Sequence, residues 1–309
     1  MNIYILGKKE DLKEEQISLL KENGKVIFIE EKQNVLKHPY IDDKEEKILA
    51  IDPDLTDWEF SNDIIEKIPN LRAICLQTTS FDWVDGEFCR GKNIKLTNVP
   101  HYSTNAVAEC ASFLMLSLAR KLPIQLKTSS TEGMVYSSDI MGLEVKGKTM
   151  GIIGLGTIGS KVAEKGKGLG MNVVYWSRNK KEADYEYMPI DKLLVESDFI
   201  FLTLAKNDET KNFVTKEMLS NMKTKACFIT IATEGIEDRE YLIKQTEAGN
   251  IGGLAFESEK DRMTNYKGNI MITKPYAWYT GEALDNMFEI WTETIIATCK
   301  NESINVVNN

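Results

Sequence analysis

The 309-residue sequence contains only two histidines, His38 and His101. Histidine has the side-chain pKa nearest neutral pH, so it is the commonest proton donor and acceptor in catalysis. Both precede residue 102, and the C-terminal segment ITKPYAWYTGEAL, residues 272–284, contains none. His38 directly precedes Pro39, and we expect it at the surface. His101 is then the one histidine left for imidazole-based proton transfer.

The sequence also has few cysteines, and none form a C-x-x-C pair. Their number is odd and most have apolar neighbours, so we expect free, buried thiols in a reducing cytoplasm. No basic N-terminal stretch followed by a long apolar run is present, and no run approaches the ~18 apolar residues of a membrane span. We therefore expect a cytoplasmic protein with neither a signal peptide nor a membrane anchor. The cysteines are Cys75, Cys89, Cys110, Cys227 and Cys299.

An excess of basic residues is absent as well. The formal net charge is −9, with acidic and basic residues interspersed. Nucleic acids and anionic membranes favour clustered lysine and arginine, so neither is expected as the main partner. A small-molecule ligand fits this composition better.

Short apolar runs alternate with amphipathic stretches along most of the chain, a pattern typical of parallel α/β folds. Residues 58–68 have helical spacing, and 103–121 form a long apolar helix. A final helix is expected from Gly281 to Cys299, and the polar stretch 127–141 is expected to form a loop. Strands are expected at 2–6, 25–30, 47–52, 71–77 and 94–99, and again in KTMGIIGLG, MNVVYWS, DFIFLTL, ACFITIA, NIGGLAFE and NIMITKP.

The segment GLGTIG, residues 154–159, has the pattern G-x-G-x-x-G between an apolar strand and a helix-like stretch. Gly154 permits the tight turn, Gly156 lets the backbone approach a pyrophosphate, and Gly159 lets helix and strand pack closely. The helix N-terminus offers free N–H groups to the anion. The motif in this context predicts a dinucleotide site, although a purely structural glycine turn has the same pattern.

The next strand ends at Ser177, where an NAD site usually has an acidic residue that binds the ribose 2′-hydroxyl. The sequence there is instead Ser177-Arg178-Asn179-Lys180. Arginine and lysine attract a 2′-phosphate, and arginine can bind it bidentately. The pattern favours NADP, with NAD as the second choice. The alternative is that Arg178 and Lys180 are only exposed loop charges.

These motifs, with NVPHYSTNAVAECASFLMLSLAR before them and LLVESDFIFLTLAKNDET and FVTKEMLSNMK after them, resemble the D-isomer-specific 2-hydroxyacid dehydrogenase family. The resemblance implies an α/β fold in which a Rossmann dinucleotide-binding domain, residues 102–283, is inserted into a flavodoxin-like substrate domain. The substrate domain comprises residues 1–101 and 284–309. Members of the family are commonly homodimers that reduce 2-keto acids or oxidise D-2-hydroxy acids in a cleft between the domains.

The resemblance also implies site residues. Gln77–Asp85 resembles the segment whose backbone amides hold the substrate carboxylate, although Ser80 stands where the family has glycine. Substrate contacts would come from Thr78, Thr79, Ser80 and Tyr102. Further cofactor contacts would come from Thr157, Ile158, Leu204, Ala205, Ile231, Ala232, Thr233 and Glu257, the last at the position of the Asp that contacts the nicotinamide amide.

The family's catalytic Arg, Glu and His are not clearly present. Thr233 occupies the Arg position, and Glu234 follows it. A simple 2-keto acid therefore loses its usual cationic anchor. Arg262 lies near the Glu position, with Glu259 and Asp261 close by. Glu259 could serve instead, and its alternative is an ordinary solvated surface acid.

The His position falls on Pro275 if AWYT is aligned without a gap, or on Tyr276 if the prolines are aligned. Tyr276 could donate a proton if Lys274, two residues away, lowered its pKa. PYAWY could equally be an aromatic packing patch. His101 is the other candidate donor, with a structural role as its alternative.

Two functions fit these observations. The first is an NADP-preferring oxidoreductase whose proton-transfer and substrate-anchoring groups have changed, acting on a carbonyl or an imine. The second is a catalytically silent protein that binds nicotinamide nucleotide as a sensor or an interaction module. Because the cofactor motifs are intact, we favour the enzyme.

Overall fold

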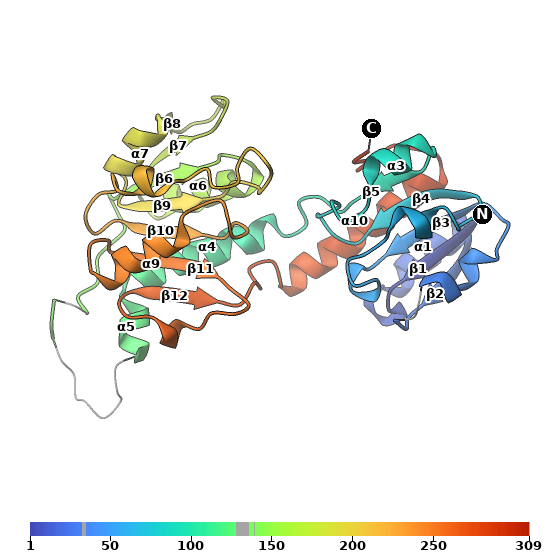
Figure 1. Ribbon diagram of the computed structural model, residues 1–309, viewed down its shortest axis with the longest axis horizontal. Coiled ribbons are helices and arrows are strands. Elements are labelled where there is room, and N and C mark those ends of the chain that lie inside the picture. Colours follow the sequence, from blue (N-terminus) through green and yellow to red (C-terminus); the bar gives the residue numbers. More distant parts are fainter. Residues whose placement is uncertain (33–34, 128–135, 139, 309) are drawn as a thin grey trace. The chain divides into compact units, whose positions relative to one another are not determined.

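The structure is a computed structural model that describes residues 1–309 except 33–34, 128–135, 139 and 309. The chain divides into two compact units (Figure 1). Unit 1 comprises Met1–Ser103 and Gly281–Asn309, and unit 2 comprises Thr104–Thr280. Each unit is built around its own parallel sheet.

Unit 1 contains a five-stranded sheet in the order β2-β1-β3-β4-β5, with parallel pairing throughout the named strands. This is the flavodoxin-like strand order. The strands read as short apolar runs because helices and loops cover both faces. From α10, the buried Trp291 donates its indole N–H to the Cys75 carbonyl oxygen at 2.9 Å, which fixes the C-terminal helix on β4. The strands are β1 (Asn2–Leu6), β2 (Lys25–Ile29), β3 (Lys47–Ile51), β4 (Leu71–Leu76) and β5 (Lys95–Thr97), and the helices are α1 (Glu14–Asn23), α2 (Asn62–Ile65), α3 (Gly86–Gly91) and α10 (Gly281–Cys299).

Unit 2 contains a seven-stranded parallel sheet in the order β12-β11-β10-β9-β6-β7-β8. Counted within the unit, this is the Rossmann order, 3-2-1-4-5-6, with one further strand. Two buried apolar clusters cover its faces, one including α4 and α6 and the other including α7, α8 and α9. The strands are β6 (Thr149–Ile153), β7 (Asn172–Trp176), β8 (Glu186–Tyr187), β9 (Phe199–Leu202), β10 (Cys227–Thr230), β11 (Gly253–Glu257) and β12 (Ile270–Thr273). The helices are α4 (Thr104–Ala119), α5 (Leu122–Lys127), α6 (Thr157–Gly168), α7 (Ile190–Glu196), α8 (Lys216–Leu219) and α9 (Arg239–Glu247).

The structure confirms the expected α/β class, the parallel strands and the terminal helix, whose bounds are Gly281–Cys299 as predicted. The helix expected at 58–68 is wrong over most of its length, because α2 covers only Asn62–Ile65. Trp58 has a φ of 57°, and this left-handed conformation is incompatible with a right-handed helix. The loop expected at 127–141 lies largely outside the described residues.

His38 is also not at the surface, contrary to expectation. It is buried, and its ring lies 5.3 Å from that of Tyr40. Burial lowers the pKa of His38, because an imidazolium loses hydration there. Packing against Tyr40 therefore decided the position of the His38 side chain.

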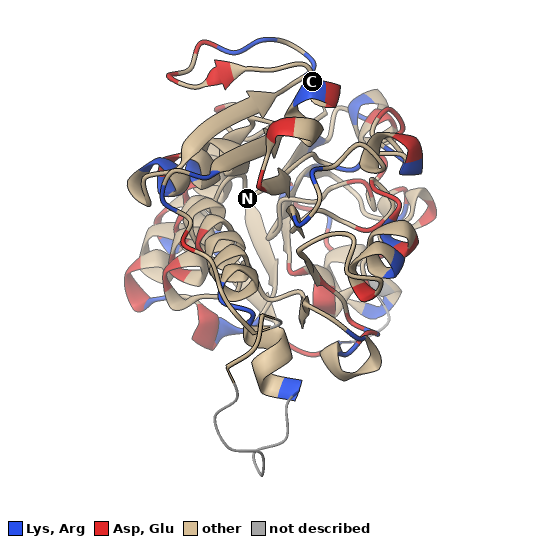
Figure 2. Cartoon of the chain, turned by 90° about the vertical axis from the view of Figure 1, so that its left-hand side faces the viewer, with Lys and Arg blue, Asp and Glu red and all other residues tan. Residues whose placement is uncertain are grey.

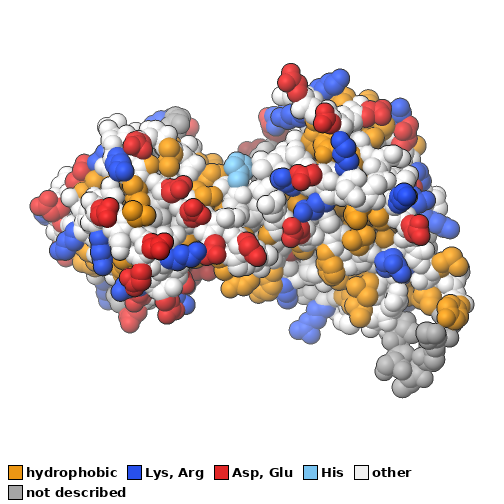
Figure 3. Space-filling model, turned by 180° about the vertical axis from the view of Figure 1, so that it is seen from behind, with side chains coloured by type: hydrophobic (Ala, Val, Ile, Leu, Met, Phe, Trp, Pro, Cys, Tyr) orange, Lys and Arg blue, Asp and Glu red, His pale blue; other side chains and the backbone are white. Residues whose placement is uncertain are grey.

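Charged side chains lie mainly on helices and loops, whereas the sheet strands carry few (Figure 2). On the face in Figure 3, acidic and basic side chains are interspersed rather than gathered by sign. The five cysteines are free, and Cys75, Cys89 and Cys227 are buried. Within the described residues, no helix combines the length and apolar character needed to cross a membrane.

Candidate functional site

The centre of the site is the point in unit 2 where strand order reverses, between β6 and β9. Ligands of open α/β sheets bind beyond the carboxyl ends of the strands at such points. The segment 154–159 begins directly after β6 at this edge. The predicted glycine motif therefore lies where the fold favours ligand binding.

Each glycine of the motif has a separate structural reason. Gly154 has a φ of +104°, and a Cβ there would lie 2.7 Å from a Leu204 methyl carbon. At Gly159 a Cβ would lie 2.2 Å from the Gly154 carbonyl oxygen, so only glycine allows α6 this close to β6. A Cβ on Gly156 would meet nothing within 4 Å. Gly156 therefore leaves open backbone, which fits a group that must approach it.

The N-terminus of α6 faces the same edge. Gly156 is its N-cap, and among the residues that the structure describes no side chain caps this end. Thr157 is exposed and Ile158 is partly buried in the first turn. The orphan N–H groups and the positive end of the helix dipole suit a pyrophosphate. The residues present thus fit a dinucleotide.

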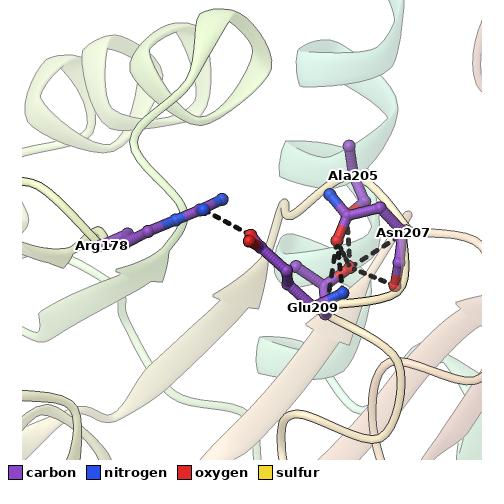
Figure 4. A network of polar contacts seen from close by, with 5 residues as sticks. Arg178, Ala205, Asn207 and Glu209 are labelled. Atoms are coloured by element: carbon purple, nitrogen blue, oxygen red, sulfur yellow. Dashed lines mark hydrogen bonds and ion pairs between the residues drawn. The ribbon is translucent and has the colours of Figure 1, made fainter.

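Beyond β7, the chain presents Ser177 and Arg178 beside this turn. Ser177 is buried, and its Oγ accepts a hydrogen bond from the Leu155 amide at 3.0 Å. Arg178 is exposed and forms an ion pair with Glu209, from the loop after β9 (Figure 4). Asn179 and Lys180 are exposed. The serine thus fixes the strand end, while the arginine extends toward solvent.

A pocket of about 320 Å³ adjoins Arg178 and Glu209. Trp176 and Phe213 stack in its wall, with ring centroids 5.1 Å apart. Leu204 also lines the pocket. Its side chain lies beside Gly154, so the pocket adjoins the glycine turn. The pocket therefore combines apolar walls with one charge of each sign.

The loop after β9 is fixed by its own polar groups. The Thr210 hydroxyl donates to the Ala205 carbonyl oxygen at 2.7 Å, and the Asn207 side chain accepts from the Glu209 amide at 3.0 Å. The Lys206 ammonium donates to the Glu234 carbonyl oxygen at 2.8 Å. These contacts connect the loop after β9 to the loop after β10.

Residues 231–234 follow β10 at the same edge of the sheet as the glycine turn, and none of them is an arginine. Ile231 and Ala232 are partly buried, whereas Thr233 and Glu234 are exposed. The Ala232 amide donates to the Thr230 hydroxyl at 3.3 Å. Thr233 offers a neutral hydroxyl beside an acid, so this loop has no cation for a substrate carboxylate.

At the end of β11, Glu257 binds the segment that precedes α10. Its Oε1 accepts from the Ala277 amide at 2.9 Å. Burial raises the pKa of Glu257, and the hydrogen bonds from the Ala277 and Tyr276 amides oppose the increase. The Lys274 ammonium donates to the Glu259 carbonyl oxygen. Tyr276 itself is 65% exposed.

The remaining expected residues belong to unit 1. The Thr79 hydroxyl donates to the Val99 carbonyl oxygen at 2.9 Å, and the Ser80 amide donates to the Thr78 hydroxyl at 3.3 Å. Ser80 is not in the left-handed region, so its backbone does not require the family's glycine. Tyr102 is partly buried, and burial raises its pKa. His101 is exposed, with a φ of 61°.

Sequence reasoning missed Glu209 and Lys206. Both lie in the segment AKNDET, where they look like ordinary loop charges. The N-x-x-T spacing of Asn207 and Thr210 indicates a capped turn, which could have shown that the loop is rigid. The partners, Arg178 and the Glu234 carbonyl, are remote in sequence, so only the fold reveals them.

The parallel sheet, the glycine turn and the open helix N-terminus together define a dinucleotide-binding protein of the Rossmann class. Residues 112–268 match the family model described as D-isomer specific 2-hydroxyacid dehydrogenase, NAD binding domain. The chain therefore belongs to the D-isomer-specific 2-hydroxyacid dehydrogenase family. It is a dehydrogenase-like oxidoreductase with a NAD-binding domain.

Individual relatives cover almost the whole chain. A glyoxylate reductase of Thermococcus gammatolerans is 31% identical over 304 residues, which span 92% of this chain and 89% of that protein. A putative 2-hydroxyacid dehydrogenase of Staphylococcus aureus strain MRSA252 is 30% identical over 319 residues, 99% of each. The solved structure of an acyclic imino acid reductase in complex with NADPH and D-Arg is 25% identical. Its superposition on this chain has a TM-score of 0.82 and covers 99% of this chain and 100% of the reductase chain.

Proposed function

We propose that this protein is an NADPH-preferring reductase of a small C=O or C=N compound. The observation that carries the cofactor choice is Arg178, exposed at the pocket beyond β7 where an NAD site has an acid. A guanidinium binds a 2′-phosphate bidentately, whereas an acid repels it. The imino acid reductase of similar structure was solved with NADPH, which supports the same choice.

A nicotinamide bound at this edge supplies the hydride; the protein must orient the nucleotide and move a proton. The open backbone at Gly156 and the N-terminus of α6 bind the pyrophosphate. Glu257 holds the backbone at Ala277, which fixes the segment carrying Tyr276. Orientation and proton transfer are thus assigned to separate parts of unit 2.

The proposed substrate does not depend on a cationic anchor at residue 233. Thr233 can donate a hydrogen bond to a polar substrate atom, while Glu234 disfavours a carboxylate close by. Relatives named glyoxylate reductase support a carbonyl substrate, and the imino acid reductase supports an imine. Glu234 favours the imine, because a protonated C=N group is cationic.

The proposed proton donor is Tyr276, with His101 as the second candidate. Tyr276 is exposed on a segment held by Glu257, so its phenol is accessible from solvent. Lys274 donates a hydrogen bond to the Glu259 carbonyl oxygen, and its proposed assistance to Tyr276 is electrostatic. His101 remains the imidazole alternative on unit 1.

The test is a titration of the protein with NADPH and NADH, followed by turnover assays. The panel contains glyoxylate, longer 2-keto acids, aldehydes, and 2-keto acids mixed with ammonia or methylamine to form imines. Tighter binding of NADPH and oxidation of NADPH with one substrate class support the proposal. Tight NADPH binding without turnover across the panel would instead support a silent nucleotide-binding protein.

We further propose a cytoplasmic homodimer that associates through unit 2. Helix α4 exposes Phe113 and Leu116, which lie three residues apart on one helical face, and α5 exposes Leu126. Exposed apolar side chains grouped in this way favour association. Light scattering after gel filtration tests this: Phe113→Asp combined with Leu116→Asp should give a monomer, and an unchanged mass would contradict the interface.

A further inference from the structure

Arg178 forms an ion pair with Glu209, and this pair affects the choice between NADPH and NADH. The Arg178 Nη1 contacts the Glu209 Oε2, and each side chain is 67% exposed. The two residues come from different loops, one after β7 and one after β9, and both line the same pocket. Their side chains point toward each other (Figure 4). The guanidinium that would bind a 2′-phosphate is therefore already paired with a carboxylate.

Both residues are attached to rigid backbone. Ser177, next to Arg178, is buried and bonded to the Leu155 amide at 3.0 Å. The Glu209 amide donates to the Asn207 side chain at 3.0 Å, and the Thr210 hydroxyl holds the Ala205 carbonyl oxygen at 2.7 Å. The Glu209 side chain takes no part in this turn, so it can move without disturbing the loop.

We propose that Glu209 is a determinant of cofactor specificity that tempers the preference for NADPH. This inference rests on the proposed role of Arg178 in binding the 2′-phosphate. An exposed ion pair contributes little stability, so it can be broken by a stronger ligand. A phosphate group carries up to two negative charges and three acceptor oxygens, which makes it a better partner for arginine than one carboxylate.

When NADPH binds, its 2′-phosphate displaces the Glu209 carboxylate from Arg178. The displaced carboxylate stays nearby and repels the phosphate. With NADH, no phosphate is present, and the Arg178–Glu209 pair stays closed. Glu209 then accepts a hydrogen bond from the ribose 2′-hydroxyl, as the acid at the end of the second strand does in NAD sites. The loop after β9 thus supplies the acid that β7 lacks, and the site accepts both cofactors.

The experiment measures dissociation constants of NADPH and NADH for the full chain, by quenching of tryptophan fluorescence, in wild type, Glu209→Gln, Arg178→Ala and the double variant. Glu209→Gln is nearly isosteric and removes the competing charge. We expect it to tighten binding of NADPH by about three- to tenfold and to weaken binding of NADH, because a neutral amide oxygen accepts the ribose hydrogen bond less well than a carboxylate. Glu240→Gln breaks an exposed pair with Lys244 on α9 and serves as the matched control, with no effect on either cofactor.

Three results would overturn the inference. NADPH affinity could be unchanged in Glu209→Gln, or both cofactors could tighten by the same factor. In either case, a selective loss of NADPH binding in Arg178→Ala would show that the proposed cofactor preference survives and only the role of Glu209 fails. The third result is equal weakening of both cofactors in Arg178→Ala, which contradicts the 2′-phosphate role and the inference together.

Discussion

The Glu257 carboxylate accepts a hydrogen bond from the Ala277 backbone amide at 2.9 Å. This contact joins the end of β11 to the segment between β12 and α10, across 20 residues of sequence. Ala277 is buried, so its N–H has no access to water and depends on a protein acceptor. Glu257 therefore acts on the segment that carries Tyr276, and it does so through the backbone.

Replacing Glu257 tests this positioning role. Glu257→Ala leaves the buried Ala277 amide without an acceptor, which should cost about 1–3 kcal/mol of unfolding free energy. Glu257→Gln keeps a side-chain oxygen and should cost less. Urea denaturation gives the free energies, and hydrogen exchange at the Ala277 amide should accelerate in Glu257→Ala alone. Equal stabilities and equal exchange in the two variants would contradict the role.

Alanine substitution can separate the packing role of Gly159 from the ligand-approach role of Gly156. Gly159→Ala places a Cβ 2.2 Å from the Gly154 carbonyl oxygen, so we expect destabilisation of about 1–3 kcal/mol from overpacking. Gly156→Ala meets nothing within 4 Å, so its stability should stay near that of the wild type. Its dinucleotide affinity should nevertheless fall at least tenfold, because the methyl group occupies the open approach. Calorimetric melting and NADPH titration distinguish these effects, and full affinity in Gly156→Ala would show that the pyrophosphate binds elsewhere.

If Tyr276 donates the proton, Tyr276→Phe should lower kcat by about 100-fold or more while NADPH binding is retained. Tyr279→Phe is the matched control, since Tyr279 is 58% exposed on the same segment. For His101, asparagine is the suitable replacement, because it tolerates the φ of 61°. Steady-state kinetics with the best substrate decide between the residues. Undiminished rates in both Tyr276→Phe and His101→Asn would exclude both candidates.

Because of Asp198, we expect the free energy of unfolding of unit 2 to decrease at acid pH. Burial raises its pKa, but the hydrogen bonds from Lys223 and the Thr149 amide outweigh this and lower it overall. The charged form is therefore stabilised by folding, and this stability is present above the ordinary value of 3.8. It is lost as pH falls through the lowered pKa, where the carboxylate becomes protonated.

We expect Asp198→Asn to destabilise the protein by about 1–3 kcal/mol at pH 7, with the difference from wild type shrinking below about pH 4. Urea denaturation at several pH values measures both quantities. Glu196→Gln removes an exposed charge that is paired with Lys192, four residues earlier in the sequence, and it controls for surface charge. A difference that stays constant from pH 7 to pH 3 would refute the assignment.

Local sequence patterns predicted most of the elements but not all their bounds. β1 follows from a short apolar run and α10 from helical apolar spacing, and both bury apolar side chains in the same cluster of unit 1. The helix expected at 58–68 was wrong because backbone conformation at Trp58 depends on local turn contacts, including an indole hydrogen bond to Asp54 at 3.0 Å. His38 was expected at the surface, yet the residue packs on Tyr40.

The sequence by itself determined the parallel α/β architecture and the glycine turn, because these depend on periodicity and on residues adjacent in the chain. It also determined that the neutral Thr233 follows Ala232 and that Arg178 follows Ser177. Only the tertiary structure decided that Arg178 is paired with Glu209 and that Glu257 holds Ala277. Such contacts join residues from separate loops, so their distances depend on how the sheet brings the strand ends together.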